Sequence, residues 1–75
     1  MSKLWQVMPD EKIPGTLNVG YTDNGTLDLN GNILQIRGGL LTVNTNSGLI
    51  DTASGSSVVK VEGGDIQNFG FIGVS

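Results

Sequence analysis

The stretch that most constrains the fold runs from Thr26 to Val43 and reads TLDLNGNILQIRGGLLTV. Apolar and polar residues alternate on both sides of Asn30-Gly31, and a third apolar run follows Gly38-Gly39. Alternation with a period of two is typical of β-strands. Asn-Gly between two such runs indicates a type I′ turn, because both central residues of that turn need positive φ. The sequence therefore predicts an antiparallel hairpin around Asn30-Gly31.

A two-residue loop also fixes the register of this hairpin. The register places Leu27 opposite Leu34, and it gathers four aliphatic side chains on one face of the ribbon, namely Leu27, Leu29, Leu34 and Ile36. Asp28 and Gln35 then point to the other face. A second hairpin is predicted around Gly63-Gly64, with Val61 opposite Ile66.

Composition extends the β interpretation to the whole chain of 75 residues, which contains one alanine, two glutamates and 12 glycines. Helix formers are scarce, while strand and turn formers dominate. Turn signals recur at short intervals, and no segment copies another closely enough to indicate a solenoid repeat. We therefore expect an all-β fold, a small barrel, sandwich or β-prism of short antiparallel strands joined by tight Asn-Gly and Gly-Gly turns.

Residues 1–15 differ from the rest of the chain, since they carry the only tryptophan, both methionines and both prolines. Pro9 and Pro14 favour extended backbone in themselves and in the residues before them. We expect an extended N-terminal arm over 1–15, followed by a single small β domain over 16–75. The arm either forms the first strand of the chain's own core or lies across a neighbouring subunit.

A chain this short buries a marginal core, and small domains usually add disulfides, a metal or oligomerisation. The sequence contains no cysteine and no histidine, so oligomerisation or docking on a larger partner is the remaining ordinary device. The candidate interaction residues are the apolar side chains of the arm and of the C-terminal tail: Leu4, Trp5, Met8, Ile13, Phe69, Phe71 and Ile72.

The sequence offers no catalytic, cofactor or metal site. Ser54, Ser56 and Ser57 lie in a small-residue loop without a G-x-S-x-G motif. The acidic and amide residues around Asp28 do not follow EF-hand spacing. The net charge is −3 and the four basic residues are scattered, which argues against a nucleic-acid partner. No apolar run approaches the ~20 residues that span a bilayer, so no membrane partner is expected.

Three classes of function remain: a structural assembly protein, a ligand-binding β module such as a lectin, and a small enzyme. The proline-punctuated arm through Gly15 and the Gly/Asn/Thr-rich short strands of 26–43 and 58–74 resemble small decoration (cement) proteins of tailed-bacteriophage capsids. More loosely, they resemble trimeric phage fibre segments. The resemblance implies a non-enzymatic homotrimer that binds the major capsid protein and stabilises the particle. It also implies assembly in the host cytoplasm and a final location on the virion surface.

Overall fold

The computed structural model describes residues 5–21, 23, 25–52 and 55–74. In these residues it contains strands and turns but no helix, and hence no helix that could cross a membrane. The strands are β1 (Trp5–Gln6), β2 (Lys12–Pro14), β3 (Leu17–Val19), β4 (Thr26–Asp28), β5 (Ile33–Arg37), β6 (Leu40–Val43), β7 (Gly48–Asp51), β8 (Val58–Glu62), β9 (Asp65–Asn68) and β10 (Phe71–Val74). The expected all-β character is confirmed.

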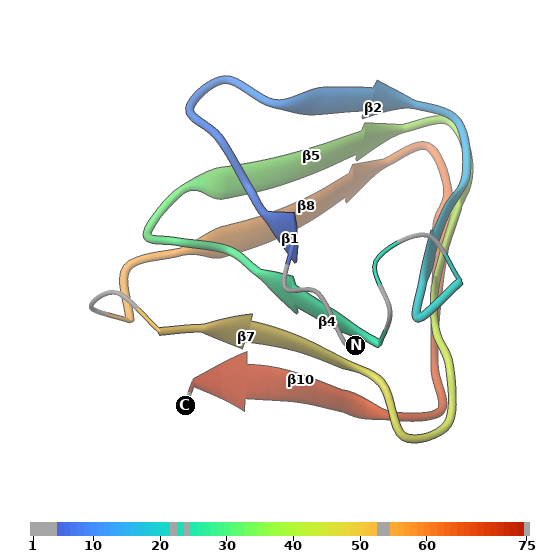
Figure 1. The fold of residues 1–75 in the computed structure, drawn as a ribbon. Helices are drawn as coiled ribbons and strands as arrows, with labels where there is room; N and C mark the ends of the chain where they lie inside the picture. Colours follow the sequence, from blue (N-terminus) through green and yellow to red (C-terminus); the bar gives the residue numbers. More distant parts are fainter. Residues whose placement is uncertain (1–4, 22, 24, 53–54, 75) are drawn as a thin grey trace.

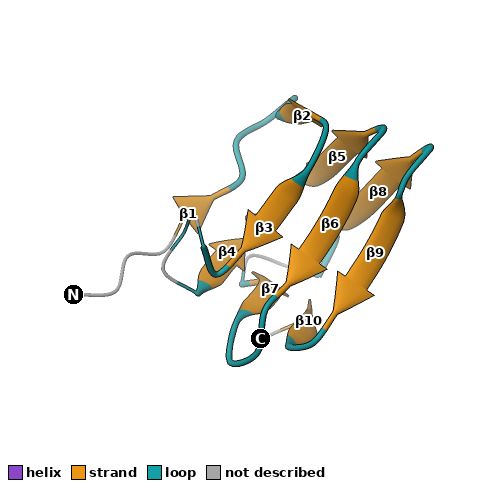
Figure 2. Cartoon of the chain, turned by 90° about the vertical axis from the view of Figure 1, so that its right-hand side faces the viewer, coloured by secondary structure: helices purple, strands orange, loops and turns teal. Residues whose placement is uncertain are grey.

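The strands form three sheets, with the orders β1-β4-β7-β10, β2-β5-β8 and β3-β6-β9, and every pairing is parallel. The chain visits the three sheets in turn and then returns to the first, so it winds as a three-sided parallel β-helix (Figures 1 and 2). In Figure 1 the chain runs clockwise as it moves away from the viewer. This is the right-handed coil expected of parallel crossover connections.

The predicted antiparallel pairing is wrong, and the described strands do not close into a barrel. The turn at Asn30-Gly31 does form: φ is 55° at Asn30 and 72° at Gly31, and the Asn32 N–H donates to the Leu29 carbonyl at 2.9 Å. However, β4 and β5 leave this turn into different sheets, and Leu27 pairs with Leu49 instead of Leu34. Alternation and turn residues specify a tight reversal of direction, but they do not specify which strand becomes the neighbour.

The hairpin predicted around Gly63-Gly64 is wrong for the same reason, because Ile66 pairs with Leu41 of the preceding coil and not with Val61. The two Gly-Gly pairs are successive copies of one corner. A Cβ on Gly39 would collide with the backbone of Gly15, and a Cβ on Gly64 would collide with the carbonyl of Gly39. The corner glycines stack directly on one another, so the solenoid repeat that sequence inspection missed is present.

Parallel register stacks like residues into columns along the axis of the coil. Leu17, Leu41 and Ile66 form one column, and Leu27, Leu49 and Ile72 form another. The buried core consists of Val7, Leu17, Val19, Leu27, Leu29, Leu34, Ile36, Leu41, Val43 and Leu49. The inward face predicted for the 26–43 stretch is therefore confirmed, although the strands that carry it pair differently.

The segment expected as an arm contributes to the first coil. Its β1 pairs with β4, and its β2 pairs with β5 of the same chain. Trp5 and Ile13 are half-buried and pack against the core.

Candidate functional interface

The C-terminal end of the coil presents an apolar surface without a covering coil among the described residues. We call this surface the terminal face and define it by Val59, Val61, Ile66 and Ile72. It lies on β8, β9 and β10, the last strands of the three sheets, which come together at one end of the molecule (Figure 2). Each of the four side chains is the last member of a column whose earlier members belong to the core.

Exposure rises sharply at the last coil. Leu41 and Leu49 are 0% exposed, whereas Ile66 and Ile72, which follow them in the same columns, are 50% and 39% exposed. The sequence analysis predicted Ile72 as an interaction residue but not the other three residues of the terminal face. In the sequence, Val59, Val61 and Ile66 show the same alternation of apolar and polar residues as the core strands. Their position at the end of the columns becomes visible only when the strands are stacked as coils.

The free edge of β8 also carries unpaired backbone groups. The Val58 N–H donates to the Asn32 carbonyl at 3.4 Å, and the Glu62 carbonyl accepts from the Gly38 N–H at 2.7 Å, so these residues turn their backbone polar groups toward β5. In a parallel pair, alternate residues direct both groups to opposite sides. Val59 and Val61 therefore direct their N–H and carbonyl groups to the free edge.

The opposite end of the coil is built differently. There the edge strands β1 and β2 have 2 and 3 residues, and β2 carries Lys12 and Pro14. The Gly15 N–H donates to the Arg37 carbonyl at 2.8 Å, so by alternation the backbone nitrogen of Pro14 faces the free edge, where it has no hydrogen to donate. Short strands, proline and lysine are the usual protections of an exposed edge. The N-terminal edge is thus protected, whereas the longer β8 contains no proline.

A shallow hollow of about 540 Å³ lies beside the terminal face, on the outside of the β4-β7-β10 sheet. Phe69 and Phe71 line it, with exposed fractions of 63% and 51%. The Phe71 ring occupies the space that a side chain at Gly73 would need, so the ring lies along β10. The remaining lining is Thr26, Thr45, Asn46, Ser47, Gly48, Ile50 and Gly70.

The structure separates the predicted interaction residues into two groups. Leu4 lies outside the described residues, Met8 is exposed, and Trp5 and Ile13 pack against the first coils. The tail residues gather at the other end, where Ile72 belongs to the terminal face and the two phenylalanines flank it: Phe69, Phe71 and Ile72.

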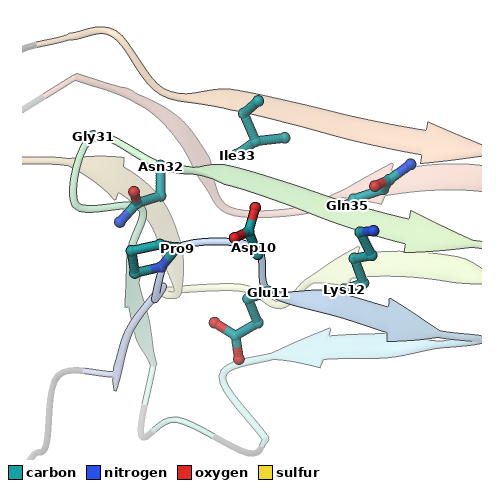
Figure 3. Close-up of a pocket in the computed structure, with 8 residues that line it drawn as sticks. All are labelled: Pro9, Asp10, Glu11, Lys12, Gly31, Asn32, Ile33 and Gln35. Atoms are coloured by element: carbon teal, nitrogen blue, oxygen red, sulfur yellow. The ribbon is translucent and has the colours of Figure 1, made fainter.

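A second, polar hollow of about 310 Å³ lies where the chain enters β2 (Figure 3). Its charged groups are Asp10, Glu11 and Lys12, and Lys12 lies close to Gln35. The Asp10 and Glu11 carboxylates point in opposite directions, and Glu11 Oε2 accepts a hydrogen bond of 3.1 Å from the Met8 N–H. The two carboxylates do not converge on one point, so the hollow does not have the paired geometry of acid–base catalysis.

The buried carboxylate of Asp28 is held by hydrogen bonds. Burial raises its pKa, but hydrogen bonds from the Thr52 hydroxyl, the Thr52 N–H, the Asn30 N–H and the Gln6 amide outweigh burial, and the net pKa lies below the ordinary value of 3.8. Asp51, also buried, accepts from the N–H groups of Gly31 and Ser57 at 3.0 and 3.2 Å. These carboxylates stabilise corners of the coil. Among the described residues, no group of three or more acidic side chains is placed to hold a metal ion.

Comparisons with protein-family models, with curated proteins and with solved structures found no match to this chain.

Proposed function

We propose that this protein is a non-enzymatic structural assembly protein that associates with itself through its terminal face and braces a larger particle. The observation that supports this proposal most directly is the contrast within single columns, where fully buried Leu41 and Leu49 are followed by half-exposed Ile66 and Ile72. These two columns end in Ile66 and Ile72, and no further strand among residues 5–21, 23, 25–52 and 55–74 covers them. Contiguous exposed apolar surface next to unpaired strand edges is typical of a protein interface.

The experiment that tests self-association compares two substitutions by light scattering over a wide dilution series. Ile66→Lys places a charge in the terminal face, and Ile33→Lys places the same charge on the outward face of β5. The two side chains are similarly exposed, at 50% and 55%, so the cost to the folded monomer is matched. We expect the wild type and Ile33→Lys to be oligomeric and Ile66→Lys to dissociate. A monomeric wild type throughout the series contradicts the proposal.

The setting that we propose for this assembly is the outer surface of a virion, with the major capsid protein as the larger partner. The support for it is the resemblance of the sequence to capsid decoration proteins, together with a rigid, turn-rich β module that exposes an apolar face. An antibody raised against the purified chain should label the outside of intact particles in electron micrographs. Labelling only of disrupted particles would contradict a surface location.

A second candidate function is recognition of a glycan, and the hollow beside the terminal face is the observation that favours it. A half-exposed phenylalanine ring lying along a strand offers a flat apolar platform, and Thr45 and Asn46 supply polar groups at its rim. Titration of Phe71→Ala and the wild type with a glycan library would test it. Binding by the wild type that the substitution abolishes, without loss of self-association, would favour this function.

A further inference from the structure

We propose that the partner on the terminal face is a second copy of this chain, docked end to end by a two-fold axis that passes through β8 at Val61. This inference rests on the proposed function and names the partner and the register of that same surface. In this arrangement the β8 strands of the two copies pair in an antiparallel manner, and Val61 of one copy lies opposite Val61 of the other.

The protection of the N-terminal edge excludes the alternative of stacking the copies head to tail. Such stacking would place β2 of one copy against β8 of the next, and it would need the backbone donor that Pro14 lacks. It would also place Lys12 next to Lys60, because Lys12, Gln35 and Lys60 already form one column on the outer face of the sheet. Two adjacent ammonium groups repel each other. A pairing that joins two C-terminal ends avoids both the missing donor of Pro14 and the contact of Lys12 with Lys60.

Hydrogen bonding and charge together select the register. Val61 turns its N–H and carbonyl toward the free edge, so two Val61 residues can exchange both hydrogen bonds across the axis. Lys60 then lies opposite Glu62 of the second copy, and Glu62 opposite its Lys60. Within one chain, Glu62 already forms ion pairs with Lys60 at 3.4 Å and with Arg37 at 3.8 Å, so the axis joins two such clusters into one network of alternating charge. A register centred on Lys60 would instead oppose two ammonium groups.

The same two-fold axis also brings the other two sides of the coil, which end in β9 and β10, against each other. In a three-sided coil, a two-fold axis that crosses one side near its middle exchanges the remaining two sides. The axis at Val61 lies one residue from the middle of β8, so β9 of each copy faces β10 of the other. Ile66 of one copy then approaches Ile72 of the second copy, and Val61 meets Val61 across the axis, while Val59 lies opposite Gly63. The columns that end in Val61, Ile66 and Ile72 therefore continue into the second copy. The interface is isologous and closes at two copies without forming a filament, so the proposed assembly is a dimer and differs from the trimer that the sequence resemblance implies.

Disulfide trapping tests the register, because the chain contains no cysteine and each introduced thiol is unique. Residues 60 and 62 of opposite copies form a non-hydrogen-bonded pair with Cα atoms about 4.5 Å apart, which is within disulfide range. We expect a mixture of Lys60→Cys and Glu62→Cys proteins to form a covalent dimer on mild oxidation. The mixed dimer keeps one intact Lys60–Glu62 pair between the copies. Either protein alone should remain uncrosslinked on a denaturing gel.

Three outcomes overturn the inference. Rapid crosslinking of Lys60→Cys alone would indicate a register centred on residue 60. Crosslinking of Lys60→Cys with Lys12→Cys would indicate head-to-tail stacking. A protein that is oligomeric by light scattering but crosslinks in none of these mixtures associates through another surface. In the first two cases association through the terminal face survives, and in the third only self-association survives. A monomeric wild-type protein in the same light-scattering series counts against the proposed function itself.

Discussion

The hydroxyl of Thr52 donates a hydrogen bond of 2.5 Å to Oδ2 of Asp28, a residue of the preceding coil. The same carboxylate accepts the Gln6 amide at 3.3 Å from the first coil and the Thr52 N–H at 3.2 Å. One side chain thus connects three successive coils at a single corner. Because Asp28 is 0% exposed, these donors replace the water that a carboxylate would otherwise bind.

The lowered pKa of Asp28 predicts how stability depends on pH. The carboxyl titrates at a lower pH in the folded state than in the unfolded state, whose pKa is near 3.8, so the unfolded state binds more protons in this window. The stabilisation is complete above the unfolded pKa and is lost as the pH falls through the lower folded pKa. Urea unfolding across the acid range should show this loss in the wild type, and Asp28→Asn should reduce it.

Asp28→Ala removes the charged acceptor of hydrogen bonds from Thr52 and Asn30. We expect the free energy of unfolding at neutral pH to fall by about 1–3 kcal/mol. Asp65→Ala is the matched control, because it removes one carboxylate from exposed β9. Equal effects of the two substitutions would contradict a structural role for the Asp28 contacts.

Gly39→Ala should destabilise the fold more than Gly38→Ala. Gly38 has a φ of 65° but open space around it, so an added Cβ costs about 1–2 kcal/mol of backbone strain. At Gly39 the Cβ would run into the backbone of Gly15, and the coils would have to separate. Chemical unfolding of both variants at one protein concentration measures the difference. A smaller loss for Gly39→Ala than for Gly38→Ala would contradict the stacked corner.

The local features of the fold could be read from the sequence, but its topology could not. Alternation around Asn30-Gly31 correctly gave the turn and the burial of Leu27, Leu29, Leu34 and Ile36, because both depend on residues near one another in the chain. It did not give the burial of Asp28, which was placed on the opposite face and is covered by neighbouring coils. Strand pairing depends instead on contacts 22 residues apart, such as Leu27 with Leu49. A tight turn serves equally well at a hairpin and at the corner of a coil, so the turn alone left the pairing open.

The repeat was hidden because the coils have unequal lengths. The register is 22 residues between β4 and β7 but 25 residues between β5 and β8. A search of the sequence for a repeat of one constant length therefore cannot align the Gly-Gly corners and the leucine columns at the same time. The tail residues Phe69, Phe71 and Ile72 were predicted as interaction residues, and the structure leaves all three exposed. The sequence could not identify Val59, Val61 and Ile66 as interface residues, because their pattern is that of core residues and only the stacked structure shows that they end their columns.

Leu27→Ala and Ile72→Ala should separate folding from association, because the two residues belong to the same column. Leu27 is fully buried, so its truncation leaves a cavity and should cost about 2–5 kcal/mol of unfolding free energy. Ile72 is 39% exposed, so its truncation should cost the monomer much less and should weaken self-association instead. Urea unfolding and light scattering of each variant measure the two effects. A larger loss of folding stability for Ile72→Ala than for Leu27→Ala would contradict the placement of Ile72 at the uncovered end of this column.

Gly31→Val tests the corner between β4 and β5. Gly31 has a φ of 72°, a region that costs an L-residue about 1–2 kcal/mol and a β-branched residue more. Its N–H also donates to Asp51 Oδ1 at 3.0 Å, so a shift of this backbone exposes a buried carboxylate in the next coil. We expect Gly31→Val to lower the unfolding midpoint in urea strongly, while Asn30→Gly, which keeps positive φ accessible at the neighbouring position, leaves it nearly unchanged. If Gly31→Val unfolds at the same urea concentration as the wild type, residue 31 does not hold the left-handed conformation on which this corner depends.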